Sequence, residues 1–363
     1  MWYELWNIFR IFLAVFFGFF HVLILSIYCL FLKMLRLNSA GSKFRQFGIN
    51  YLFHITSTFV RIITGDKIFI AYNKNANVGS KMISIGNHII DFDFISSSKC
   101  FYDLNLFKNM TYIGKKAISN YPLIGFIFDT FKGICVDRDN KNSPFGSELK
   151  KFKEFKNLNT HNIFIYPEGS IFNETGYEKS LKFAQKTNIT VNNELLQLKN
   201  LLVPRIRGFF TVVSEVSNYD TVISLTTLMN PYERELAGSK AHKKLVITKE
   251  VSLSQIIIVD SLSGNQIKDH DFLYKEFLRK DQILEKYKNG KYKRAQNVED
   301  IKKIIFDIFP NENYEIRMVT YYTNFSILLI LIVVMIVWLI IRIIYKLIRP
   351  KSVININIKL KST

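Results

Sequence analysis

Two long apolar runs constrain the fold of this chain more than any other feature. The first run spans residues 11–32, IFLAVFFGFFHVLILSIYCLFL, and the second spans 325–341 and continues to residue 348. A helix that crosses the core of a bilayer needs about 20 predominantly apolar residues. The sequence therefore predicts a transmembrane helix near each end. A cleaved signal peptide is the alternative for the first run, but no small-residue cleavage pattern follows it.

The basic residues beside the two runs predict conflicting orientations. Lys and Arg are enriched on the cytosolic side of membrane segments. The cluster after the first run, which includes Lys33 and Arg36, therefore places the middle of the chain in the cytosol. The cluster at residues 342–351 would then be lumenal, and a re-entrant C-terminal helix or an extra crossing would remove the conflict.

The composition favours anionic partners. The formal net charge is +19, and 48% of the 363 residues are hydrophobic, which suits a protein that meets lipid head groups and anionic substrates. Nucleic acid is not an expected partner, because Lys and Arg are spread through the chain without a recognisable RNA- or DNA-binding module. The three cysteines form no CxxC pair and the histidines lack partners at metal-ligand spacing, so neither a metal nor a bound cofactor is expected.

The middle of the chain alternates short β-branched stretches with longer amphipathic ones. The predicted strands lie in residues 81–87, 110–114, 133–139, 162–169, 221–228 and 244–251. Helical spacing of apolar residues appears in 143–159 and 176–188. This pattern predicts an α/β fold with a central, mostly buried mixed sheet flanked by helices. Residues 271–296 are interpreted as a charged helix that is solvated or lies on a membrane surface.

The stretch ISIGNHIIDFDFI, residues 83–95, places His88 five positions before Asp93. On one continuous helix the two side chains would point about 140° apart, so their contact requires a turn. Gly86 and Asn87 supply it by ending the strand, and Asp93 suits the first turn of a helix. A carboxylate on one imidazole nitrogen leaves the other nitrogen to take a proton from a hydroxyl. The alternative is a strand end followed by a capped turn.

Three further stretches place charged or turn-forming residues directly after strand-like runs. They are GICVDRD (133–139), FIYPEGSIFNE (164–174) and LLVPRIRGF (201–209). Because ligands of α/β sheets bind beyond the carboxyl ends of strands, we expect residues of these stretches to converge on the edge that carries His88. Arginine at such an edge suits a pair of phosphate oxygens.

Together these stretches resemble a known family. NHIIDFD, VDRD, YPEGS and VPR, in this order and spacing, are similar to the four sequence blocks of the glycerolipid and lysophospholipid acyltransferases, the 1-acylglycerol-3-phosphate acyltransferase superfamily. KKAISNYPLIGF is similar to a Lys and Pro-x-x-Gly segment of that family. SIFNETGYEKSLKFAQK and LQLKNLLVPRIRGFFTVV resemble its lysocardiolipin acyltransferase branch. The resemblance covers residues 80–290.

The resemblance implies transfer of a fatty acyl group from acyl-CoA, a co-substrate, to the free hydroxyl of lysophosphatidate or another lysophospholipid. His88 would be the general base, Asp93 would orient it, and Arg138 would hold the acceptor's phosphate. Six further residues are implied in substrate binding, namely Lys116, Glu168, Gly169, Ser170, Pro204 and Arg205. Pro204 and Arg205 would shape the acyl side of the pocket. A CoA-independent transacylase and a catalytically silent lipid-binding scaffold are the alternatives.

Three residues depart from the usual family pattern. Ser170 replaces Thr, Tyr166 replaces Phe, and Phe94 replaces a Trp that often follows the aspartate. These changes keep the hydroxyl or the bulk, so they affect the choice of acceptor rather than activity. The sequence is expected to encode an integral protein of the endoplasmic reticulum membrane with a cytosolic catalytic domain.

The expected organisation has six parts. They are an N-terminal membrane anchor (1–35), a membrane-proximal helical segment (36–79), the acyltransferase catalytic domain (80–295), a linker (296–324), a C-terminal transmembrane segment (325–348) and a basic tail (349–363).

Overall fold

An eight-stranded mixed sheet organises the part of the chain that the computed structural model describes, residues 2–64, 67–74, 78–90, 93–137, 140, 144–230 and 254–319. The chain divides into two compact units, Met1–Tyr321 and Tyr322–Thr363. The second unit lies outside the described residues, and so do the predicted transmembrane segment at 325–348, the tail at 349–363 and the predicted strand at 244–251.

The strands and helices follow one another in an α/β sequence. The sheet strands are β1 (Lys67–Asn73), β2 (Lys81–Gly86), β3 (Met110–Lys115), β4 (Ile134–Val136), β5 (His161–Ile165), β8 (Thr221–Asn230), β9 (Ser254–Ser263) and β10 (Tyr314–Met318), and β6 (Thr190–Val191) pairs with β7 (Glu194–Leu195) in a separate hairpin. The α-helices are α1 (Trp2–Met34), α2 (Lys43–Thr64), α3 (Asp93–Asp103), α4 (Pro122–Thr130), α5 (Leu149–Lys156), α6 (Glu174–Lys186), α7 (Ile206–Val216), α9 (Phe272–Asn289) and α10 (Val298–Ile308).

The strand order in the sheet is β10-β1-β9-β8-β2-β5-β3-β4. The five strands from β8 to β4 run parallel to one another, whereas β9 is antiparallel to β8 and β10 is antiparallel to β1. The prediction of an α/β fold with a large mixed sheet flanked by helices is thus confirmed. The predicted strands at 81–87, 110–114 and 221–228 correspond closely to β2, β3 and β8.

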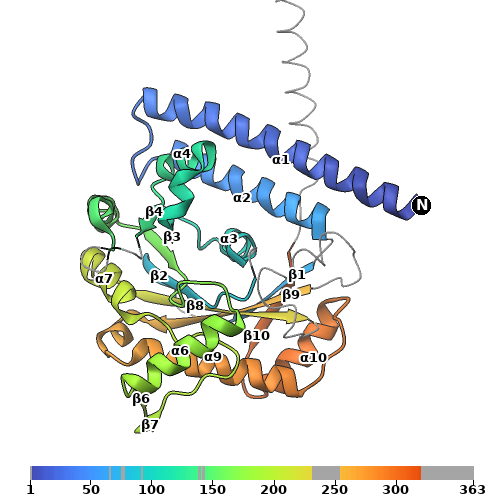
Figure 1. Ribbon diagram of the computed structural model, residues 1–363, viewed down its shortest axis with the longest axis vertical. Helices are drawn as coiled ribbons and strands as arrows, with labels where there is room; N and C mark the ends of the chain where they lie inside the picture. Colours follow the sequence, from blue (N-terminus) through green and yellow to red (C-terminus); the bar gives the residue numbers. More distant parts are fainter. Residues whose placement is uncertain are drawn as a thin grey trace, which may run out of the picture. The chain divides into compact units, whose positions relative to one another are not determined.

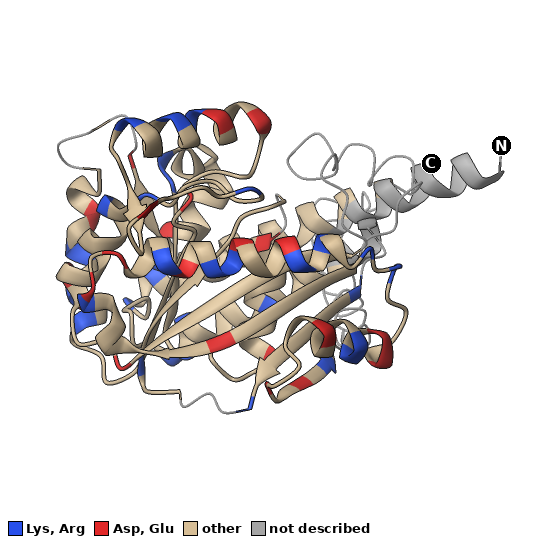
Figure 2. Cartoon of the chain, turned by 90° about the horizontal axis from the view of Figure 1, so that it is seen from below, with Lys and Arg blue, Asp and Glu red and all other residues tan. Residues whose placement is uncertain are grey.

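Helices cover both faces of the sheet (Figure 1). Successive strand residues point to opposite faces, and in β8 this sends Val222 into one apolar cluster and Ile223 into the other. The first cluster includes Phe277 of α9, and the second includes Leu25 of α1 and Phe101 of α3. Figure 2 shows the α9 side from below, with basic and acidic residues mixed along its helices. The sheet is therefore buried between two helical layers.

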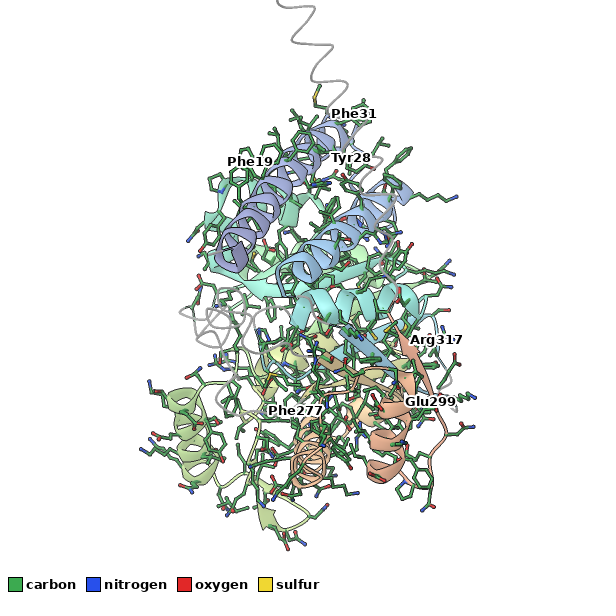
Figure 3. All side chains as sticks on the ribbon, turned by 90° about the vertical axis from the view of Figure 1, so that its right-hand side faces the viewer. Phe19, Tyr28, Phe31, Phe277, Glu299 and Arg317 are labelled. Carbon is green, nitrogen blue, oxygen red and sulfur yellow. The ribbon has the colours of Figure 1, made fainter. Side chains whose placement is uncertain are left out.

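The prediction of an N-terminal transmembrane helix is wrong. Among the residues that the structure describes, no helix combines the length and the apolar character needed to cross a bilayer. One face of α1 belongs to the domain instead: Leu25, Cys29 and Leu32 are buried where α1 packs on α2 and α4. The opposite face remains exposed, and Figure 3 labels Phe19 and Phe31 there, across the molecule from Phe277.

Two other interpretations also need correction. Residues 296–324 were expected to be a linker, but their described part forms α10 and β10, and β10 pairs with β1. The helix expected to be solvated or on a membrane surface is α9, which buries ten of its residues, among them Phe277 and Lys280. The sequence interpretation treated the charged residues of α9 as exposed, whereas several of them are buried in the core.

Arg45, a basic residue shortly after the first apolar run, is completely buried in the fold. Its guanidinium donates to the carbonyl of Ala40 at 2.5 and 3.0 Å, to that of Met110 at 3.1 Å and to that of Phe131 at 2.9 Å. It thus ties the start of α2 to the start of β3 and the end of α4. Burial lowers the pKa of Arg45 to about 10, so the group stays charged at neutral pH.

We expect Arg45→Met to lower the free energy of unfolding by about 3 kcal/mol, because three buried carbonyls would lose their charged donor. Urea unfolding followed by circular dichroism measures the change as a lower midpoint at an unchanged slope. Lys43→Met, at an exposed position of the same helix, is the matched control. Equal midpoints for the two variants would contradict the prediction.

Candidate active site

The parallel strands bring the sequence blocks to one edge of the sheet. Strands β2, β5, β3 and β4 are parallel neighbours in that order, so their carboxyl ends meet. His88 follows β2, Glu168 follows β5, Lys116 follows β3 and Asp137 follows β4. Of the predicted site residues, Arg138 lies outside the described residues.

His88 and Asp93 are brought together by a turn. The chain leaves β2, and the Asp93 carboxylate at the first position of α3 accepts the backbone N–H of Ile89 at 2.6 Å and that of Ile90 at 2.8 Å. The same oxygen, Oδ2, lies 3.4 Å from Nδ1 of His88. The Asp93 side chain is fully buried, whereas 17% of the His88 side chain is exposed. The imidazole therefore has a buried carboxylate on one nitrogen and an accessible edge.

Glu168 holds the main chain of His88. One carboxylate oxygen accepts the backbone N–H of His88 at 2.5 Å, and the other accepts the N–H of Leu202 at 3.1 Å. The carbonyl of His88 accepts the N–H of Phe172 at 2.9 Å. Both oxygens of the buried carboxyl are thus used on backbone groups. This arrangement lets Glu168 hold the turn that carries His88, whereas its role in substrate binding stays a prediction.

Burial dominates the electrostatics of Glu168. It raises the pKa of this carboxyl to about 8, against the lowering effect of the two N–H donors and of the Lys280 charge. Lys280 is itself fully buried and donates to the carbonyl of Leu225 at 2.5 Å. Burial lowers the pKa of Lys280 to about 8. The pKa of Glu168 is thus raised and that of Lys280 is lowered, so the two values lie close together.

The YPEGS and VPR blocks contact each other. The backbone N–H of Arg205 donates to the carbonyl of Pro167 at 2.8 Å. Gly169 has a φ of +72°, which favours glycine, and a Cβ there would lie 3.2 Å from Cδ of Arg205. Pro204 is buried, Arg205 is exposed, and Ser170 is partly buried. Arg205 therefore covers the Gly169 turn and presents its guanidinium at the surface.

Lys116 marks the other end of this edge. Its ammonium forms an ion pair with Asp137 at 2.6 Å, and the two side chains are 63% and 26% exposed. Asp137 directly precedes Arg138 in the chain. A basic side chain is therefore anchored beside the end of β4. Within the described ranges, no group of three or more His, Cys, Asp and Glu side chains is arranged to hold a metal ion.

Two residues of this region make contacts that the sequence did not predict. The side-chain amide of Asn87 donates to the carbonyl of Thr227 at 3.1 Å and accepts its N–H at 2.8 Å, which fixes the end of β2 to β8. Tyr166 stacks on the His88 ring, with centroids 4.3 Å apart. The only sequence signals were an amide directly before the histidine and an aromatic residue directly after β5.

Comparison with known proteins agrees with this arrangement. A family model described as Acyltransferase matches residues 67–226, which include His88, Asp93 and Glu168. Over this part, a little under half of the chain, the sequence matches the acyltransferase family. The recognition of the 1-acylglycerol-3-phosphate acyltransferase superfamily in the four sequence blocks is thereby confirmed. The closer assignment to the lysocardiolipin branch stays a prediction.

Three relatives illustrate the family. A probable 1-acyl-sn-glycerol-3-phosphate acyltransferase 5 of Arabidopsis thaliana is 26% identical over 67% of this chain and 61% of its own length. An uncharacterized acyltransferase of Saccharomyces cerevisiae is 26% identical over 70% of this chain and 71% of its own length. The 1-acyl-sn-glycerol-3-phosphate acyltransferase delta of Mus musculus is 22% identical over 56% of this chain and 52% of its own length. The chain thus spans less than two thirds of the plant and mouse relatives.

The raised pKa of Glu168 predicts a pH-dependent stability. The folded pKa is about 8 and the ordinary value is 4.5, so the fold favours the protonated carboxyl. That stabilisation is complete below pH 4.5 and is lost as the pH rises through 8. Relative to Glu168→Gln, we expect the wild-type free energy of unfolding to fall by about 3 kcal/mol from pH 5 to pH 8.

Urea unfolding at the two pH values measures this difference. Glu178→Gln, at an exposed position of α6, is the control and should follow the wild type. The prediction fails if Glu168→Gln and the wild type lose the same stability over this pH range.

Proposed function

We propose that the chain transfers a fatty acyl group from acyl-CoA to the free hydroxyl of a lysophospholipid, with lysophosphatidate as the first acceptor to test. The contact between His88 and Asp93 at the carboxyl edge of parallel strands carries this proposal. It is the geometry of a base oriented by a carboxylate, and it occurs in the part of the chain that matches the acyltransferase family.

The reaction needs no nucleophile from the protein. Nδ1 of His88 faces Asp93, which leaves Nε2 to take the proton of the acceptor hydroxyl. The hydroxyl oxygen then bonds to the thioester carbonyl carbon, and the carbon–sulfur bond breaks. The imidazolium returns its proton to the departing thiolate, so the products are an ester and the free thiol of CoA. Asp93 stabilises the imidazolium between the two proton transfers.

The acceptor's phosphate is assigned to the edge beside β4. Lys116 is anchored there by Asp137, and Arg138, the predicted phosphate ligand, is the next residue along the chain. Lys and Arg side chains suit the oxygens of a phosphate monoester. Arg205, exposed over the Gly169 turn, is assigned to the anionic part of acyl-CoA.

We expect His88→Ala to lower the rate of acyl transfer by about 100- to 10,000-fold, the usual contribution of a general base. Labelled oleoyl-CoA is offered to the purified protein with lysophosphatidate, lysophosphatidylinositol, lysophosphatidylglycerol, monolysocardiolipin or glycerol 3-phosphate, and the product is separated by chromatography. His270→Ala, at an exposed histidine beside α9, is the matched control and should keep the wild-type rate.

The donor decides between this reaction and its alternatives. Transfer that requires labelled phosphatidylcholine and ignores oleoyl-CoA would replace the proposal by a CoA-independent transacylase. Binding of these lipids without transfer from either donor, in wild type and variant alike, would leave a lipid-binding scaffold.

The exposed face of α1 supports a reaction at a lipid surface. Phe12, Phe16 and Phe19 are 63%, 59% and 65% exposed, and exposed apolar residues continue along the same face to Met34. A contiguous apolar surface of this kind marks a binding surface rather than a solvated one. We propose that this face meets the lipid in which the acceptor resides, whereas the endoplasmic reticulum remains the expected location.

Replacement of both Phe16 and Phe19 by Asp should weaken binding to phospholipid vesicles by at least about 10-fold, because charges would replace two aromatic side chains that bury themselves in the lipid on binding. Sedimentation with vesicles measures the bound fraction. Phe306→Asp is the control, since Phe306 is 65% exposed on α10, across the sheet from α1. Equal loss in both variants would show that charge alone, and not this face, governs binding.

A further inference from the structure

The His88 ring lies on the face of an aromatic side chain. The rings of His88 and Tyr166 are nearly parallel, with an interplanar angle of 16° and centroids 4.3 Å apart. Asp93 meets the imidazole at Nδ1, at the edge of the ring. The carboxylate and the phenol ring therefore restrain different motions: the first fixes rotation within the ring plane, and the second fixes the tilt of that plane.

Tyr166 is itself held in place from several sides. Its ring packs edge to face on Phe164, with centroids 4.7 Å apart. Gly86 provides the space, because a Cβ at that position would lie 3.0 Å from Cε1 of Tyr166 and 3.1 Å from Cζ of Phe164. A larger residue at the end of β2 would thus displace the ring on which His88 rests.

The phenol hydroxyl connects this ring to the helix of the carboxylate. It lies 3.2 Å from Oγ of Ser97 on α3. Ser97 is four residues after Asp93, so both side chains lie on the same face of α3. Tyr166 therefore contacts both the ring of His88 and the helix α3, which carries Asp93.

We propose that Tyr166 is a positioning residue that holds the His88 ring through its face and, through Ser97, fixes its distance to Asp93. The inference rests on the proposed function, in which His88 is the base. An imidazolium over an aromatic ring also gains a cation–π attraction. The ring thus favours the protonated state that His88 occupies between the two proton transfers.

Few of the charged groups near His88 touch its ring directly, whereas Tyr166 does. Asp93 on α3 and Tyr166 after β5 face the imidazole, and Glu168 accepts the backbone N–H of His88. The charge of Lys280 on α9 acts on Glu168 and lowers its pKa. Burial and the nearby Asp93 charge raise the pKa of Tyr166 well above 10, so the phenol stays neutral where an acyltransferase works.

The test compares Tyr166→Leu, Tyr166→Phe and Ser97→Ala with the wild type. Proton–carbon spectra of histidine-labelled protein report the His88 ring, whose signal is identified by its loss in His88→Ala. A proton above an aromatic face is shifted upfield, so Tyr166→Leu should move this signal downfield, whereas Tyr166→Phe and Ser97→Ala keep the ring and should move it less.

Kinetics provide the second readout. With oleoyl-CoA and lysophosphatidate, Tyr166→Leu should lower kcat by about 10-fold with little change in KM, the equivalent of one cation–π contact. The acid limb of kcat/KM should move to lower pH, because the imidazolium would lose a stabilising contact and release its proton more readily. Tyr166→Phe should restore the limb to its wild-type position.

The outcomes separate this inference from the proposed function. A Tyr166→Leu protein with an unmoved His88 signal and an unmoved acid limb overturns the inference, even if acyl transfer by the wild type is confirmed. A misfolded Tyr166→Leu protein leaves the decision to Ser97→Ala and Tyr166→Phe: if neither alters kcat or the His88 signal at all, the proposed link to α3 is wrong. If Tyr166→Leu moves the His88 signal but the wild type transfers no acyl group, the stacking is upheld and the proposed reaction is rejected.

Discussion

The site depends on the contacts of the buried Glu168 carboxyl group. It accepts one backbone N–H from the His88 turn and one from Leu202, two segments more than a hundred residues apart in the chain. Loops that leave the carboxyl ends of different strands have no ladder to align them. A single side chain with two acceptor oxygens performs this alignment, and the cost of burying it appears in its raised pKa.

The consequence is a histidine restrained at its backbone, at Nδ1 and on one face of its ring. Glu168 and Phe172 hold its backbone, Asp93 holds Nδ1, and Tyr166 supports its face. The proposed reaction has the substrate hydroxyl approach the ring edge that carries Nε2. In the proposed reaction, a base held in this way loses little freedom when the substrate binds, so the rate comes from orientation rather than from a reactive nucleophile.

Local sequence patterns predicted much of this arrangement. The β-branched runs gave the positions of β2, β3 and β8, and the turn between His88 and Asp93 followed from the 100° step of a helix. The parallel strands then explain why NHIIDFD and YPEGS lie side by side. The role of Tyr166 could not be predicted, because stacking depends on the registration of β2 beside β5. The same limit applies to Glu168, whose partners are backbone groups without any sequence signature.

The wrong predictions for α1 and α9 have a common physical origin. Each assigned a helix surface to lipid or to water, whereas that surface packs against other parts of the protein. Hydropathy assigned the apolar run of α1 to lipid, but one of its faces packs on α2 and α4. Charge assigned α9 to solvent, but Glu276 and Lys280 are buried, with Glu276 bonded to Arg279 and Lys280 bonded to a β8 carbonyl. Composition describes a helix alone, whereas burial is decided by the whole fold.

The position of β1 in the sheet has a consequence for how the chain acquires its structure. This early strand lies between β9 and β10, whose residues are some 185 to 250 positions later. On the ribosome β1 therefore remains unpaired until nearly the whole domain has been synthesised. Such distant pairings make folding slow and leave strand edges open to aggregation in the meantime. A chain of this topology depends on protection of its nascent N-terminal part.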